Sequence, residues 1–190
     1  MSEQLNHWEI RGEVSKALVD DLLKIENALE QSDDQTIRRN YVRALFAYYE
    51  FTLSNLRESV ANIIQLKFQQ GNNLILADII PLLDNSHNLT DKGTVRLEPN
   101  KISFINLIRY TIGKYCKEIG LEENFFGDTG WDFFKKSVQV RHKITHPKWD
   151  IGIDINDSQL EFCIKGKEWW NNSLASIREF RINNPFAWEN

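Results

Sequence analysis

The stretch QTIRRNYVRALFAYYEFTLSNLRESVANIIQLKFQQ, residues 35–70, decides the fold. Its apolar side chains recur at the three- to four-residue spacing of one face of an α-helix. Ser32-Asp33-Asp34 offers N-cap oxygens before it, and Gly71 follows it as a stop signal. The sequence therefore predicts one long helix here. The residues on its inward face are Ile37, Tyr41, Leu45, Tyr48, Thr52, Leu56, Val60 and Ile63.

The same spacing predicts further helices on both sides of this stretch. Long helices joined by short links are typical of helical bundles. The expected fold is therefore all-α, a bundle of four to six helices. The other predicted ranges are about 14–29, a short helix that ends near Pro81, 104–119, a helix from the capping-box sequence 129–132 to Pro147, and 158–181.

Residues 84–101 do not follow the helical pattern. This segment is polar, Asp91-Lys92-Gly93 is a turn signal, and residues 94–97 are suited to a strand. We expect a small inserted loop or hairpin, too short to be a domain. Residues 150–157 are predicted to form a loop or a short extended stretch.

The length and composition fit one globular domain. The chain has 190 residues, of which 42% are hydrophobic and 26% charged. We expect a single domain over residues 1–190, with loose termini at 1–12 and 183–190. The net charge of −4 argues against a broad nucleic-acid surface, so any such site has to be a local basic patch.

The cysteines and the apolar pattern indicate the compartment. Cys116 and Cys163 lie in helical segments without a CxxC motif, so we expect buried thiols in a reducing environment. No apolar run approaches the roughly 20 residues of a membrane span. Residues 1–12 lack an apolar signal core. The sequence therefore predicts a cytoplasmic protein without membrane contact.

The segment KKSVQVRHKITHPK, residues 135–148, differs from the rest of the chain. It holds five lysines or arginines and two of the four histidines, and it has no acidic residue. Because the residue before a proline leaves the α region, His146 is expected at the helix end, where the break can turn it back toward Arg141. A planar guanidinium matches a phosphate, and an imidazole moves a proton near neutral pH. This pattern predicts a site for a phosphodiester substrate.

Arg141 and His146, separated by four residues and followed by Pro147, resemble the signature motif of HEPN-domain ribonucleases. In that family the Arg and the His lie at the end of a helix in an all-helical bundle. The residue after the Arg is often Asn or Asp there, and here it is His142. Residues 38–50 are also similar to bacterial members from toxin and defence operons, with the MAE-like branch as one candidate.

The resemblance implies a metal-independent endoribonuclease that needs no cofactor. It implies that a homodimer brings two motifs together, and that RNA is cut by its own 2′-hydroxyl, which leaves a cyclic phosphate. It also implies a toxin–antitoxin or anti-phage defence role, with an antitoxin or another operon partner. Arg141 is then expected to stabilise the scissile phosphate, with His146 as general acid or base and His142 assisting. The expected substrate-binding residues are Lys135, Lys136, Lys143 and Lys148, and Glu50 is an accessory candidate.

Simpler interpretations stay open for these residues. Arg141 can be a solvated arginine and His146 a helix-capping donor. Glu50 can pair with Arg141 or form another surface or bundle salt bridge. His142 and His146 have the spacing of a helical metal pair, but no third ligand is evident, so no metal site is expected. The lysines can form a solvated face, and Trp169-Trp170 is expected to pack in the core rather than stack on bases. The alternative functions are a non-catalytic HEPN module that binds RNA, a nucleotide or a partner protein, and a purely structural helical domain.

Overall fold

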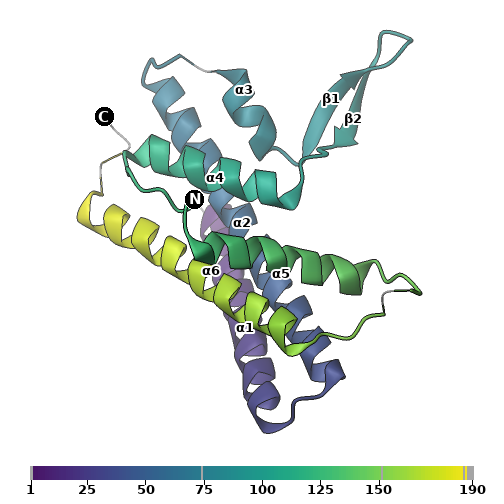
Figure 1. Cartoon of the computed structure of the whole chain (residues 1–190). Coiled ribbons are helices and arrows are strands. Elements are labelled where there is room, and N and C mark those ends of the chain that lie inside the picture. The colour runs from purple at the N-terminus through teal and green to yellow at the C-terminus, as the bar shows by residue number, and fades with distance from the viewer. Residues whose placement is uncertain (1, 74, 151, 186, 188–190) are drawn as a thin grey trace. The chain divides into compact units, whose positions relative to one another are not determined.

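Helices dominate the structure, as the sequence predicts. The computed structural model describes residues 2–73, 75–150, 152–185 and 187, and it describes their side chains except for 2–8 and 86–89. The chain is 73% helical, which confirms the all-α bundle. The elements in chain order are α1 (Ser2–Gln31), α2 (Gln35–Gln69), α3 (Leu76–Ile79), the 3-10 helix η1 (Ile80–Leu82), β1 (Asn85–Leu89), β2 (Val95–Pro99), α4 (Phe104–Ile119), α5 (Thr129–Thr145) and α6 (Asp157–Asn183) (Figure 1).

Helix α2 begins and ends close to the predicted residues. The backbone N–H groups of Thr36 and Ile37 donate to Oδ1 of Asp34 at 2.6 and 3.0 Å. These bonds satisfy donors that have no partner inside the helix. At the other end, Gly71 has a φ of 96°, which lets the chain turn away without the strain that a side chain would impose.

Helix α5, which carries the basic segment, begins one residue earlier than its capping-box sequence predicts. The N-cap is Asp128 rather than Thr129, and its Oδ1 accepts a hydrogen bond from the N–H of Trp131 at 2.8 Å. Asp is at least as strong an N-cap as Thr, and its charge is also stabilised by the helix dipole.

Replacing Asp128 with alanine is expected to lower the free energy of unfolding by about 1 kcal/mol, because the N–H of Trp131 loses its acceptor. Urea unfolding followed by circular dichroism measures this change. Asp128→Asn is the control, since asparagine keeps an acceptor oxygen at the cap. An Asp128→Ala midpoint equal to that of the wild type would show that this cap does not stabilise α5.

The polar segment 84–101 forms the expected hairpin. Strands β1 and β2 pair in antiparallel register, with Asn85 opposite Pro99 and Leu89 opposite Val95. Two paired strands alone are marginally stable in water.

The N-terminal helix begins earlier than predicted, whereas the C-terminal helix ends near the predicted residue. Helix α1 begins at Ser2, so residues 2–12, which the sequence analysis expects to be loose, are helical. Helix α6 stops at Asn183, where the loose C-terminal segment is expected to begin. Residues 186 and 188–190 of that segment lie outside the described part of the chain.

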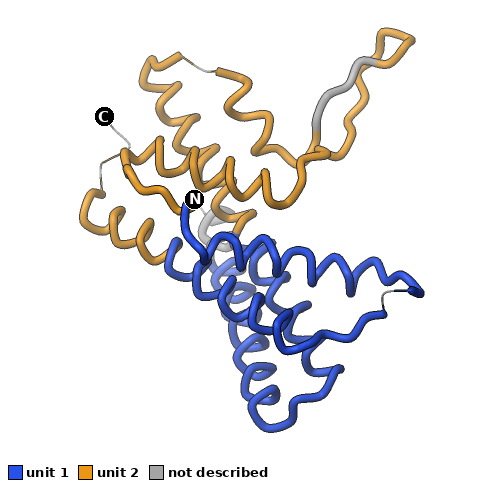
Figure 2. Tube along the Cα trace, viewed as in Figure 1, with its two compact units in different colours: residues 1–52, 127–173 blue, residues 53–126, 174–190 orange. Residues whose placement is uncertain are grey.

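The chain divides into two compact units (Figure 2). Unit 1 contains residues 1–52 and 127–173, and unit 2 contains residues 53–126 and 174–190. That residues 1–190 form a single domain stays a prediction, which this division into units does not test. In the part of the chain that the structure describes, no helix combines the length and the apolar composition of a membrane span.

Unit 1 has an aromatic core. The ring centroid of Tyr49 on α2 lies 5.1 Å from that of Phe134 on α5 and 5.1 Å from that of Trp170 on α6. Trp131 lies 4.9 Å from Trp169. Trp169 and Trp170 are both buried, which confirms their predicted packing role. Rings of this size dominate the energetics of a core, so these contacts hold the three helices together.

Unit 2 has an aliphatic core around α4, in which Ile108, Ile112 and Ile119 are buried. Cys116 of this unit and Cys163 of unit 1 are free and buried, as expected. Burial raises the pKa of the Cys116 thiol to about 11 and that of Cys163 to about 12. Both thiols are therefore protonated at neutral pH, and neither is a nucleophile.

Candidate functional site

Helix α5 is held in unit 1 by one buried face, which includes Phe134 and Ile144. Gly166 of α6 lies against this face so closely that a Cβ at residue 166 would come within 3.1 Å of the Cα of Phe134. The orientation of α5 is therefore fixed by packing. His142 and His146 fall on its exposed face.

A cavity of about 410 Å³ lies on this exposed face, near the C-terminus of α5. The ring centroids of His142 and His146 are 4.7 Å apart, with an angle of 57° between the ring planes. Such rings can serve one reaction centre together, since a neutral imidazole accepts a proton and a protonated one donates it. The lining residues are Val138, Gln139, His142, Lys143, His146 and Lys148.

Arg141 does not line this cavity but contacts α2 instead. Its Nη2 donates to Oε1 of Glu50 at 2.8 Å, and its guanidinium carbon lies 5.9 Å from the ring centroid of Phe46. The side chains of Arg141 and Glu50 are 34% and 49% exposed. The salt bridge that the sequence analysis left open for Glu50 is therefore formed. Arginine has five N–H donors, so Arg141 keeps donors for a further ligand.

The backbone explains why His146 lies beside His142 rather than Arg141. His146 is the C-cap of α5, and its N–H still donates to the carbonyl oxygen of His142 at 3.0 Å. The chain leaves the helix at His146 itself, where ψ is 67°. The break before Pro147 thus comes too late to turn His146 back toward Arg141.

Two of the four candidate lysines lie at the cavity. Lys143 and Lys148 both line it. The Lys143 ammonium donates to the carbonyl oxygen of Asp154 and lies 3.4 Å from Oε1 of Gln159. Among the described residues, the Lys148 side chain has no hydrogen-bond or ion-pair partner. Lys148 is therefore the lysine most available to a bound phosphate.

The other two lysines lie further back on α5 and do not line the cavity. Lys135 forms an ion pair with Asp132 at 2.7 Å. The Lys136 ammonium lies 4.9 Å from the ring centroid of Phe162 and 5.5 Å from that of Phe133. The basic segment is therefore split into a part at the cavity and a part with partners of its own.

The loop between α5 and α6 is anchored by side chains of α2 that the sequence analysis missed. Nη1 of the buried Arg38 donates to the carbonyl oxygen of Ile155 at 2.7 Å, and its Nη2 donates to Oδ1 of Asp157 at 2.6 Å. Gln35 donates to the Ile155 carbonyl at 3.0 Å and accepts from the Ile155 N–H at 2.7 Å. Arg38 also pairs with Asp33, and this holds the pKa of that carboxyl below its usual range.

The spacing of apolar residues in α2 indicates that Arg38 is buried. It stands three residues before Tyr41 and seven before Leu45, so it shares the buried face of α2. A guanidinium on such a face requires acceptors, because an unpaired buried charge is costly. Its acceptors Ile155 and Asp157 lie 117 and 119 residues away, and periodicity does not identify them.

The described residues offer no evident metal site. Among them, no three or more His, Cys, Asp or Glu side chains are grouped to hold a metal ion. His142 and His146 thus form a pair without a third such ligand in the described part of the chain.

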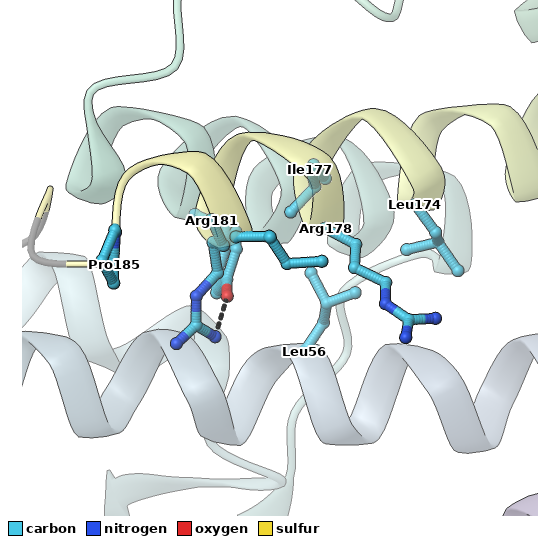
Figure 3. A pocket seen from close by; sticks show the side chains of 8 residues that line it. Leu56, Leu174, Ile177, Arg178, Arg181 and Pro185 are labelled. Atoms are coloured by element: carbon cyan, nitrogen blue, oxygen red, sulfur yellow. Dashed lines mark hydrogen bonds between the residues drawn. The ribbon is translucent and has the colours of Figure 1, made fainter.

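A second cavity, of about 420 Å³, lies within unit 2 between α6 and α2 (Figure 3). Its walls are mostly aliphatic, and Arg178 and Arg181 project from α6 toward α2. Nη1 of Arg181 donates to the hydroxyl of Tyr115 at 2.7 Å. Arginine stays protonated, and burial raises the pKa of Tyr115, so neither exchanges protons near neutral pH. The cavity on α5 is therefore the candidate site.

Comparisons with models of protein families, with curated proteins and with solved structures found no match for this chain. The chemistry of the site therefore follows from its own residues. They are two adjacent imidazoles, two lysines and a neighbouring arginine at the end of one helix.

Proposed function

We propose that the chain is a metal-independent endoribonuclease of the HEPN type. The observation that carries the proposal is the pair of His142 and His146, 4.7 Å apart between centroids, in a cavity that Lys143 and Lys148 also line. Positive charge favours a phosphodiester, and imidazoles move protons near neutral pH. In the dimer proposed below, Arg141 of the second chain adds a planar phosphate ligand. The resemblance of the Arg141–His146 motif to HEPN ribonucleases supports the same activity.

The reaction needs a base, an acid and positive charge. One imidazole, in its neutral form, removes the proton from a 2′-hydroxyl, and that oxygen attacks the adjacent phosphorus. The bond from phosphorus to the 5′-oxygen breaks, and a protonated imidazole gives that oxygen a proton. The products are a 2′,3′-cyclic phosphate and a 5′-hydroxyl. His146 is the proposed principal acid or base and His142 its partner, while Arg141 stabilises the charge on the phosphorane.

A nuclease assay in the presence of EDTA tests this proposal. The purified protein is expected to cleave unstructured RNA in excess EDTA, because every group in the proposed steps is a side chain. Mass spectrometry of the products should show 2′,3′-cyclic phosphate ends. His146→Ala, purified in the same way, controls for contaminating nucleases. Cleavage that disappears in EDTA, or products with 3′-hydroxyl ends, would contradict the proposal.

We expect the active form to be a homodimer that also brings Arg141 to the histidines. Within one chain Arg141 is paired with Glu50 and does not line the cavity of His146. In a two-fold interface one helix end can meet its own copy. Arg141 of one chain then faces His146 of the other. Analytical ultracentrifugation at micromolar concentration measures the mass.

Mixed dimers of two inactive variants test this arrangement. When Arg141→Ala and His146→Ala chains are co-expressed, random pairing makes about half of the dimers mixed, each with one complete site of two. About one quarter of the wild-type activity should therefore return. Each variant alone is the control. A monomeric mass with full activity would contradict the dimer, and a dimer without recovery would place both residues of a site in one chain.

The proposal extends to a toxin–antitoxin or anti-phage defence role in the cytoplasm, with an antitoxin or another operon product as partner. It is supported by the resemblance of residues 38–50 to such proteins and by the two free cysteines, which suit a reducing compartment. Expression in a bacterial host should stop growth for the wild type and not for His146→Ala. Equal growth of both strains would remove this part of the proposal.

The ion pair between Arg141 and Glu50 favours a second candidate function. It neutralises the arginine within the chain. A non-catalytic HEPN module can bind RNA, a nucleotide or a partner protein without a free arginine at the histidines. Binding of RNA in a band-shift experiment, with no cleavage by the wild type, would favour this candidate.

A further inference from the structure

Trp149 is the most exposed large apolar side chain among those described. Its exposed fraction is 98%, although it stands directly after Lys148, which lines the candidate site. Tryptophan is usually buried over most of its surface. An indole fully in water forfeits a large stabilisation that its burial would give. The position of Trp149 beside the site therefore requires an explanation.

The loop that carries Trp149 does not depend on the indole for its own structure. The N–H of Gly152 donates to the carbonyl oxygen of Lys148 at 3.3 Å, and Gly152 has a φ of 69°. Further along, Ile155 is 0% exposed and is held by Gln35 and Arg38. The same loop thus buries its isoleucine as an anchor and leaves its tryptophan outside.

We infer that Trp149 stacks on a nucleobase of the RNA next to the scissile phosphate. This inference rests on the proposed ribonuclease function. Trp149 follows His146 by three residues and Lys148 by one, so a nucleotide whose phosphate lies at these side chains has its base within reach of the indole. Stacking on an aromatic ring is a main source of affinity for single strands and tolerates any base, because every base has a π-face.

The surrounding charge favours RNA over an apolar protein partner as the ligand of Trp149. Lys143 and Lys148 line the cavity next to Trp149, and the Lys148 ammonium has no ion-pair partner among the described residues. An indole beside a basic cavity combines the two features of a single-strand site, which are backbone charge and a stacking surface. Paired bases are covered on both faces by their neighbours. Trp149 therefore selects an unpaired nucleotide.

Binding to a blocked substrate tests the inference. An RNA oligonucleotide that the wild type cuts is labelled with fluorescein, and a 2′-deoxynucleotide at the mapped cut site blocks the attack. Fluorescence anisotropy then gives the Kd. Trp149→Ala should raise the Kd by about 10- to 100-fold, and Trp149→Phe by less than about threefold, since phenylalanine keeps a ring. The melting temperatures of both variants should match the wild type, because the side chain is exposed.

An abasic nucleotide identifies the stacked base. With the base removed on one side of the cut site, wild type and Trp149→Ala should bind equally, because there is nothing left to stack on. A Trp149→Ala Kd equal to that of the wild type on intact RNA overturns the inference. The inference is also overturned if Trp149→Ala still binds more weakly than the wild type to RNA with the abasic nucleotide on either side of the cut site. If the wild type cuts no RNA, the proposed function fails together with the inference, whereas cleavage with an unchanged Kd for Trp149→Ala overturns the inference alone.

Discussion

Replacing His146 with alanine is expected to lower the rate of RNA cleavage by about 10²- to 10⁴-fold, the contribution that a placed acid or base typically makes. The side chain lines the cavity, and its ring lies 4.7 Å from that of His142. Truncation removes one of the two proton carriers. Single-turnover kinetics at saturating protein measures the loss, because substrate binding then no longer limits the rate.

The fold should survive this change. His146 is exposed, and the hydrogen bond that caps α5 runs from its backbone N–H to the carbonyl of His142, so it persists in alanine. The free energy of unfolding should change by less than about 0.5 kcal/mol. His142→Ala is the matched comparison, since it removes the other ring. Wild-type cleavage by both variants, at unchanged stability, would show that neither imidazole takes part in the reaction.

Periodicity predicts the major helices but not the first turns of α1, which begins at Ser2 although residues 1–12 are expected to be loose. The end of α2 was predicted within one residue, and α5 ends before Pro147 as expected. The N-cap of α5 was misplaced by one residue, because Asp128 and Thr129 are both good caps and the sequence does not show which side chain reaches the N–H of Trp131.

The site was predictable only in part. The adjacency of His142 and His146 follows from their spacing of four residues on one helix. The ion pair between Arg141 and Glu50 joins residues 91 positions apart, and helical spacing indicates the face of a side chain but not its partner on another helix. Lys148 was predicted to bind substrate, while the exposure of Trp149 depends on how the loop turns, which no periodicity encodes.

Replacing Arg141 with alanine is expected to lower the cleavage rate by about 10²- to 10³-fold, the usual cost of losing a charged donor aimed at a developing oxyanion. Arg141→Lys should restore only part of it, because an ammonium does not make the planar, bidentate contact of a guanidinium. Arg43→Ala is the matched control. Arg43 is an exposed arginine of the same unit whose Nη1 donates to Asn40, and its loss should leave cleavage within about threefold.

A Glu50 variant distinguishes two roles for Arg141, which are binding the phosphate and joining α5 to α2. If the arginine served only to join α5 to α2, Glu50→Gln and Arg141→Ala would cost similar, small amounts of stability, because a half-exposed ion pair contributes at most about 1 kcal/mol. Neither change would then alter cleavage beyond that loss. If Arg141 binds the phosphate, the Glu50 carboxylate competes with the phosphate for the guanidinium. Glu50→Gln removes this competitor and should strengthen RNA binding, whereas Arg141→Ala should weaken it. Equal Kd values for RNA in wild type and both variants would leave Arg141 a purely structural residue.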